Sequence, residues 1–219
     1  MRIAFLGTSH AAQHLSAAAQ AKGFELVAPG EAELIFVSED TPTDEAGRRD
    51  LGVIRELVAQ AREYDVPIVL TSQVPPGFTR SFSEGCRIYH QAETLRMYDA
   101  EERALNPEML IVGAEDMDEP LPGVYQTYLR AFDCPLLIMT WESAEFTKIA
   151  INCILASQVD CTNDLAAAAA KIGASWEAVK LALRHDSRIG PHAYLDPGDW
   201  KQSRHLLRDM RTLLEIESS

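Results

Sequence analysis

Up to about residue 139, the chain alternates between short apolar runs and longer stretches in which hydrophobic positions recur with helical period. The apolar runs predict strands near residues 2–6, 33–38, 67–71, 86–90, 110–114 and 135–139. The periodic stretches predict helices near 10–22, 48–63 and 122–132. Strands that alternate with helices are typical of an α/β fold built on a parallel sheet.

The pattern changes from Glu142 onward. No Pro or Gly interrupts the chain between Glu142 and Ile172, and Gly173 is a suitable C-terminal stop. At 1.5 Å per residue, such a helix would be ~45 Å long, which is longer than an ordinary crossover. Two more helices are expected near 175–185 and 199–216, with Ser175 and Asp199 as N-caps. We therefore expect a reduced Rossmann-like dinucleotide-binding domain over 1–140 and an all-helical domain with one long central helix over 141–219.

The first strand runs directly into a candidate phosphate-binding turn. Gly7 follows the strand and precedes a helix, as the first glycine of a GxGxxG turn does. Ser9 stands at the position where the backbone must approach a pyrophosphate, and Ala12 at the position where helix packs on strand. Gly7, Thr8 and Ser9 are thus candidate cofactor-binding residues, and a plain strand–helix junction is the alternative.

A length argument weakens the expected affinity for NAD. The apolar run Phe24–Ala28 ends shortly before Glu33 opens the next strand, whereas a parallel crossover needs about a dozen residues. The missing piece would carry the adenosine side of a dinucleotide pocket. Ala28 and Pro29 also stand where an acidic residue normally binds the ribose, and Glu31 is a poor substitute.

The composition excludes several classes of partner. A net charge of −13 opposes binding to a nucleic-acid backbone, and no apolar run reaches the ~20 residues of a membrane span. The chain enters a strand at Arg2 without a signal peptide, so we expect a cytoplasmic protein. The four cysteines form no CxxC pair and are expected to be free thiols. His10 and His14 have helical spacing, but no third ligand is evident, so no metal is expected.

Several segments resemble the UDP-glucose/GDP-mannose dehydrogenase family, which oxidises sugar nucleotides with NAD. The similar segments are TSQVPPGFTR (71–80), QAETLRMY (91–98), ESAEFTKIAINCILA (142–156) and DSRIGPHAYLDPG (186–198). The resemblance implies catalytic roles for Lys148 and Asn152, which lie four residues apart on one helix face. It also implies a catalytic role for Glu93 in activating water, a cofactor contact for Gln73, and sugar-nucleotide contacts for Arg96 and for Arg188, the latter across a subunit interface.

The family's next motif, GFGGSCFPKD, aligns with WKQSRHLLRD at residues 200–209. Asp209 is retained, and the resemblance implies that it orients or deprotonates a reacting group. His205 stands in place of the nucleophilic cysteine. Capture of an aldehyde as a thiohemiacetal needs that thiol. The resemblance therefore implies at most a two-electron alcohol/aldehyde step. The family's C-terminal domain is expected to be absent.

The long helix has apolar positions on more than one side, including Ile149, Ile154 and Val159. A single small sheet cannot cover them all, so we expect a homodimer formed through this helix. Two functions remain open at this stage. One is an NAD-dependent oxidoreductase acting on a UDP-hexose-like sugar nucleotide. The other is a catalytically inactive relative that binds a nucleotide or a partner protein as a dimer.

Overall fold

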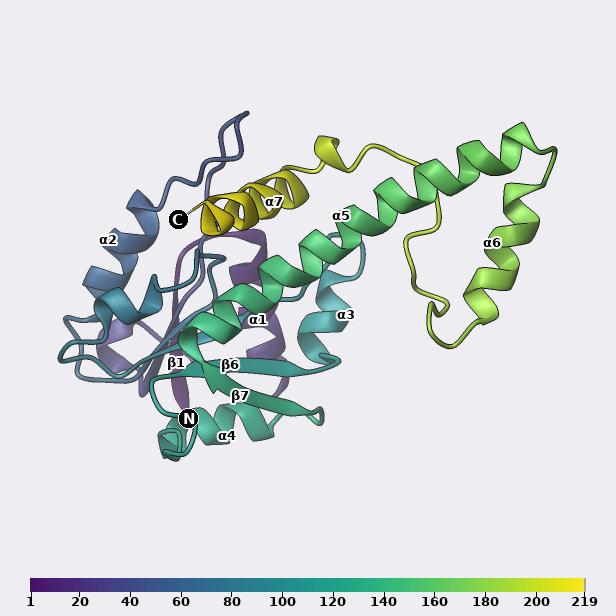
Figure 1. Ribbon diagram of the computed structural model, residues 1–219. Helices are drawn as coiled ribbons and strands as arrows, with labels where there is room; N and C mark the ends of the chain where they lie inside the picture. Colours follow the sequence, from purple (N-terminus) through teal and green to yellow (C-terminus); the bar gives the residue numbers. More distant parts are fainter. Residues whose placement is uncertain (219) are drawn as a thin grey trace. The chain divides into compact units, whose positions relative to one another are not determined.

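The computed structural model describes residues 1–218 (Figure 1). The chain forms two compact units. The first comprises residues 1–42 and 49–148, and the second comprises residues 43–48 together with the chain from Ile149 onward. The boundary falls inside helix α5 (Trp141–Lys171). The division into a dinucleotide-binding domain over 1–140 and a dimerisation domain over 141–219 stays a prediction.

The first unit is built on a seven-stranded sheet with the order β2-β1-β3-β4-β5-β6-β7. Neighbouring strands are parallel except β5 and β6, which are antiparallel. The strands are β1 (Arg2–Leu6), β2 (Glu25–Leu26), β3 (Leu34–Val37), β4 (Ile68–Leu70), β5 (Ile88–Ala92), β6 (Leu110–Ala114) and β7 (Leu136–Thr140). The expected α/β fold class is confirmed.

Helices cover both faces of this sheet because its strands β3 and β4 are apolar at every position. In β3, Leu34 and Phe36 point into one core, and Ile35 and Val37 point into the other. The first core packs against α1, α3 and α4, and the second against α2. The helical segments of this unit are α1 (His10–Ala21), η1 (Pro29–Glu31), α2 (Gly52–Ala61), η2 (Thr79–Phe82), α3 (Ala100–Leu105) and α4 (Gly123–Arg130).

The start of α5 packs tightly on the sheet. A Cβ at Gly113 of β6 would lie 2.9 Å from both Trp141 Cα and Ala144 Cβ, so only glycine allows this approach. Trp141 is 2% exposed, and its indole N–H donates to the carbonyl of Ile88 at 3.1 Å. The first turn of α5 is therefore fixed against β5 and β6.

The second unit contains the rest of α5, followed by α6 (Trp176–His185), η3 (Trp200–Gln202) and α7 (Arg204–Glu217). Side chains of α5 hold the irregular segment between α6 and η3. Thr162 donates to the carbonyl of Tyr194 at 2.8 Å, and the amide of Asn163 both donates to and accepts from the backbone of Gly198.

Three details differ from the elements expected from sequence. The helix expected over 199–216 is broken: Asp199 caps η3, and Ser203 caps α7 through a bond from Leu206 N–H. Helix α3 was not expected, since its six residues are too few to show a clear helical period. The strand β2 has only two residues and runs beside β1. No helix within residues 1–218 is long and apolar enough to cross a membrane.

Candidate functional site

The turn after β1 is tightly packed and leads directly into α1. Gly7 has φ +113°, and a Cβ there would lie 2.2 Å from the carbonyl oxygen of Ser38, so a glycine is required. Ser9 caps α1: its hydroxyl accepts the N–H of Ala12 at 3.1 Å and donates to the Ser38 carbonyl at 3.0 Å. The N–H of Thr8 donates to Oε2 of Glu39 at 2.7 Å. A carboxylate of the chain itself therefore lies at this turn.

The connection from β2 to β3 is short, as the length argument predicted. It contains only η1 between two strands that both run parallel to β1, one on each side. Ala28 precedes η1, and Glu31 is exposed within it. In the described chain, no helix lies between β2 and β3 that could form an adenosine-binding lobe.

Glu93 lies close enough to Lys148 for the lysine charge to act on its carboxyl group. Glu93 directly follows β5, and its carboxylate accepts the N–H of Leu95. Burial raises the pKa of Glu93, while the Lys148 ammonium and the Leu95 N–H partly offset this rise. Asp40 and His10 also act on this carboxyl group, the first raising and the second lowering its pKa. A half-buried acid with a raised pKa is a candidate for proton transfer in catalysis.

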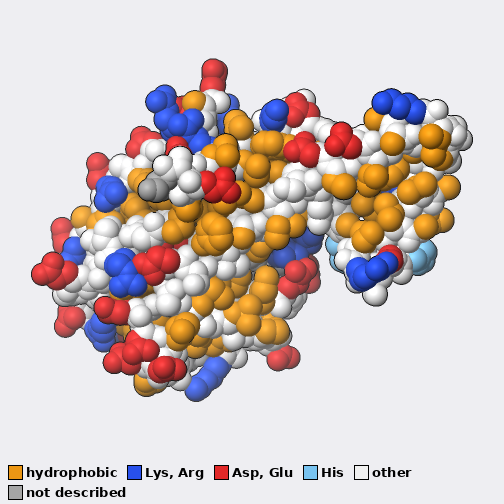
Figure 2. Space-filling model, in the orientation of Figure 1, with side chains coloured by type: hydrophobic (Ala, Val, Ile, Leu, Met, Phe, Trp, Pro, Cys, Tyr) orange, Lys and Arg blue, Asp and Glu red, His pale blue; other side chains and the backbone are white. Residues whose placement is uncertain are grey.

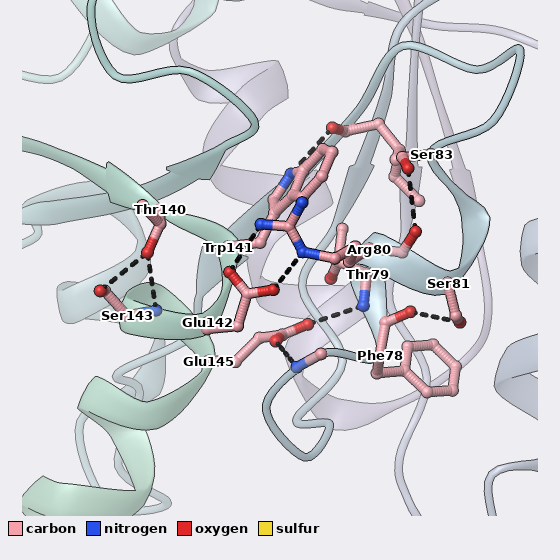
Figure 3. A network of polar contacts seen from close by, with 12 residues as sticks. Phe78, Thr79, Arg80, Ser81, Ser83, Thr140, Trp141, Glu142, Ser143 and Glu145 are labelled. Carbon is pink, nitrogen blue, oxygen red and sulfur yellow. Dashed lines mark hydrogen bonds and ion pairs between the residues drawn. The ribbon is translucent and has the colours of Figure 1, made fainter.

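The segment 71–80 is bound to the first turns of α5 (Figure 3). The Glu145 carboxylate accepts the N–H groups of Gly77 at 2.6 Å and Thr79 at 2.8 Å, although its side chain is only 1% exposed. Arg80 forms a fork with Glu142, with bonds of 2.5 and 3.1 Å, and lies over the Trp141 ring. These contacts connect two of the segments on which the family resemblance was based.

The other predicted residues of the first unit lie at two places. Gln73 is half-buried within the segment 71–80. Arg96 is bound to Asp99 through two hydrogen bonds of 3.2 and 2.5 Å and lies over the Tyr98 ring. The guanidinium of Arg96 is therefore already paired within the chain.

In the second unit, Asn152 and Asp209 form a buried pair. The Asn152 amide donates to Oδ2 of Asp209 at 2.6 Å, and Arg208 Nε donates to Oδ1 at 3.1 Å. The three side chains are 6%, 0% and 3% exposed, respectively. The structure thus brings together two residues that the resemblance had marked as catalytic, and it adds Arg208 to them.

Arg188 lies on the exposed segment that follows α6. Its guanidinium forms two hydrogen bonds with Asp186, at 3.0 and 2.7 Å, and its side chain is 86% exposed. This ion pair lowers the pKa of Asp186. The predicted contact of Arg188 with a sugar nucleotide across a subunit interface stays a prediction.

The two histidines of α1 approach each other. Nε2 of His10 lies 3.1 Å from Nε2 of His14. Within residues 1–218, no group of three or more His, Cys, Asp or Glu side chains could hold a metal ion. The four cysteines are free, and only Cys161 is exposed.

Sequence reasoning missed three polar residues of these sites. Glu39 follows β3, Glu145 lies one turn into α5, and Arg208 precedes Asp209. The run Ser38-Glu39-Asp40 could have been noticed, because polar residues that directly follow a fully apolar strand lie at the carboxyl edge of a parallel sheet.

Comparison with known proteins gives a consistent result. The sequence profile of the UDP-glucose/GDP-mannose dehydrogenase family, central domain, matches residues 142–217. An uncharacterised protein of Methanocaldococcus jannaschii is 32% identical over 184 residues, which cover 77% of this chain and 20% of that protein. A UDP-glucose 6-dehydrogenase of Pseudomonas aeruginosa is 29% identical over 181 residues, which cover 74% of this chain and 40% of the enzyme. The chain therefore spans less than half the length of these relatives.

The fold also has relatives among solved structures. The structure of a UDP-glucose dehydrogenase from Pyrobaculum islandicum superimposes with a TM-score of 0.81 at 19% identity, and the match covers 99% of this chain and 64% of the other. At this identity, the similarity establishes the arrangement of strands and helices.

Proposed function

Since the chain belongs to the nucleotide-sugar dehydrogenase family, we propose that it is an oxidoreductase that binds a UDP-hexose-like sugar nucleotide and, with NAD, performs at most one two-electron step. The observation that supports this best is the proximity of Glu93 and Lys148 in the first unit. A half-buried acid with a raised pKa can take up or release the proton of an alcohol, and the ammonium can stabilise a developing oxyanion.

The limit of two electrons follows from residue 205. A second oxidation requires covalent capture of the aldehyde, which in this family depends on a cysteine thiol. The sequence has His205 there, and its four cysteines lie at 86, 134, 153 and 161. Asp209 and Asn152, which bind each other, are proposed to orient the substrate, and Arg96 and Arg188 to contact the sugar nucleotide.

NAD does not fit the first turn in the conformation described. The Glu39 carboxylate accepts the N–H of Thr8, so its negative charge lies beside the N-terminus of α1, where a pyrophosphate would bind. The side chain of Ser9 adds bulk at the position where family members of this fold carry glycine. Binding of NAD at Gly7, Thr8, Ser9 and Gln73 therefore requires that Glu39 leave this position.

Turnover of UDP-glucose with NAD tests the proposal. We expect slow formation of NADH. Lys148→Ala should lower its rate by about 100-fold or more, because the ammonium stabilises the negative charge that develops on the substrate oxygen in the transition state. Lys171→Ala is the matched control, since Lys171 is an exposed lysine in the last turn of the same helix. Equal rates in the two variants would contradict the proposed role of Lys148.

A second candidate function is a sugar-nucleotide-binding relative without catalysis. It is favoured by the buried bond between Asn152 and Asp209, which leaves the amide committed to a carboxylate. Stabilisation of the protein by UDP-glucose in a thermal-shift experiment, with no NADH formed even at millimolar NAD, would select this function. Turnover that is sensitive to Lys148→Ala would rule it out.

We also propose that the protein is a homodimer formed through α5. Within the second unit, Cys153, Ile154, Ser157, Gln158, Cys161 and Leu213 line a shallow groove. Ile154 is 59% exposed, and Leu214 on α7 is 60% exposed. Apolar side chains on α5 and α6 also gather at the right of Figure 2, where these two helices lie. Burial of such surface favours association with a second copy.

A further inference from the structure

The turn between β1 and α1 already holds an anion, which is supplied by the chain. Oε2 of Glu39 accepts the N–H of Thr8 at 2.7 Å and the hydroxyl of Thr8 at 3.3 Å. The N-terminal N–H groups of a helix attract anions, because they lack partners within the helix and lie at its positive end. Thr8 directly precedes Ser9, the N-cap of α1, so the Glu39 carboxylate lies beside the end of the helix at which a phosphate binds in comparable turns.

Further hydrogen bonds fix both the backbone and the carboxylate of Glu39. Its backbone N–H donates to the hydroxyl of Ser72 at 2.9 Å, which fixes the chain after β3 against the chain after β4. Its second carboxylate oxygen, Oε1, accepts the N–H of Asp40 at 2.9 Å. The Ser38 carbonyl approaches Gly7 so closely that no side chain could replace that glycine. The position of the carboxylate is therefore a consequence of the backbone path.

The sheet topology makes this position significant. The strand order reverses between β1 and β3, since β2 lies on one side of β1 and all later strands lie on the other. In open α/β sheets, ligands bind at such a switch point, outside the carboxyl ends of the strands. Gly7 and Glu39 follow β1 and β3 at this end. Next to Glu39, the Ser38 hydroxyl is buried and has no hydrogen-bond partner within residues 1–218.

We propose that Glu39 is the specificity-determining residue of this turn: its carboxylate is bonded to Thr8 beside the N-terminus of α1, and its negative charge opposes the binding of anionic cofactors. The inference rests on the proposed function only in assigning NAD to this turn. A pyrophosphate at the N-terminus of α1 must lie beside this negative charge, and two like charges a few ångströms apart repel strongly in a partly buried site. Removal of that one charge should therefore increase the affinity of the turn for anions.

Titration of the full chain with NADH, and separately with inorganic pyrophosphate, tests this by calorimetry. We expect Glu39→Gln to bind both at least tenfold more tightly than the unsubstituted protein. Two control substitutions each remove one negative charge, as Glu39→Gln does. Glu56→Gln removes an exposed acid on α2, and Asp40→Asn removes the exposed acid adjacent to Glu39. Both should leave the affinity within about twofold, because neither side chain is bonded to Thr8.

In Glu39→Gln, the amide oxygen could still accept the N–H of Thr8, so Glu39→Ala is a second variant that removes this acceptor as well. Its affinity for NADH and pyrophosphate should rise as much as that of Glu39→Gln, or more. The inference is overturned if neither variant of Glu39 binds NADH or pyrophosphate more tightly than the unsubstituted protein. It is also overturned if Asp40→Asn gives the same gain, because the effect would then be a general one of charge. Failure of the proposed oxidoreductase function is a separate result: absence of UDP-glucose turnover in a variant that has gained NADH affinity.

Discussion

The carboxylate of Glu145, one turn into α5, accepts the backbone N–H of Gly77 at a distance of 2.6 Å. The same carboxylate accepts the N–H of Thr79, so that one buried side chain satisfies two N–H groups of an irregular segment (Figure 3). Backbone N–H groups buried in loops otherwise lack partners, at a cost of about 1–3 kcal/mol each. Glu145 therefore fixes the segment 71–80 to the start of α5.

Replacement of Glu145 should reduce the stability of the first unit. We expect Glu145→Ala to lower the free energy of unfolding by about 2–4 kcal/mol, because two N–H groups lose their acceptor. Glu145→Gln should cost less, since its amide oxygen still accepts one bond. Glu142→Ala, which breaks a partly exposed ion pair with Arg80, is the control and should cost under about 1 kcal/mol. Equal urea midpoints for the two alanine variants would contradict this account.

His90 on β5 should make the protein sensitive to mild acid. It is 2% exposed, and Nδ1 has no hydrogen-bond partner within residues 1–218. Burial lowers the pKa of His90 from 6.5 to about 3. Between these two values, the unfolded chain binds a proton that the folded chain does not. The free energy of unfolding therefore falls as pH falls below 6.5, by up to about 1.4 kcal/mol per pH unit.

His90→Leu removes this titration. Relative to the unsubstituted protein, we expect the variant to gain about 2 kcal/mol between pH 7.5 and pH 5, measured by urea unfolding at both values. His185→Gln, which replaces an exposed histidine at the end of α6, should follow the unsubstituted protein at both pH values. A His90→Leu variant with the same pH dependence as the unsubstituted protein would show that folding does not lower the pKa of His90.

Most strands could be predicted because hydrophobic burial imposes a pattern on the sequence. In β3, for example, four successive apolar residues are buried on both faces of the sheet. The antiparallel pairing of β5 with β6 could not be predicted, since pairing direction depends on how distant segments pack. The break before Ser203 was missed for a local reason: Asp199 and Ser203 are both good caps, and the periodic pattern runs across both.

The candidate site was predictable only where chemistry and spacing coincide. Lys148 and Glu93 were identified by resemblance, and their electrostatic proximity depends on the packing of α5 beside β5. The missing adenosine lobe followed from chain length alone. Glu39 was not identified, because an acid was sought after the second strand rather than after the third. The acid follows β3, which pairs with β1 on the side opposite β2, and only the strand order reveals this.

The pair of Asn152 and Asp209 should stabilise the second unit. Asp209→Ala would remove the buried carboxylate that accepts from both Asn152 and Arg208, at a cost of about 3–5 kcal/mol. Asn152→Ala should cost about 1–3 kcal/mol. Asp164→Ala on the exposed side of α5 is the control and should change stability by under about 0.5 kcal/mol. A double-mutant cycle measures the coupling, and a coupling energy near zero would mean that the 2.6 Å bond contributes nothing.

The exposed apolar surface of α5 and α7 predicts the oligomeric state. We expect light scattering coupled to size-exclusion chromatography to give the mass of a dimer at micromolar concentration. Ile154→Glu should shift the protein to a monomer, because a carboxylate at a side chain that is 59% exposed in the single chain would become buried without a partner. Val53→Glu is the matched control: Val53 is a 44% exposed apolar residue on α2, which belongs to the first unit, and its replacement should leave the dimer intact. A monomeric mass for the unsubstituted protein, or an equal effect of both substitutions, would contradict association through α5. The groove that contains Ile154 is shallow and open. Side chains of a second copy of the helix would pack into it, as ridges pack into grooves between helices.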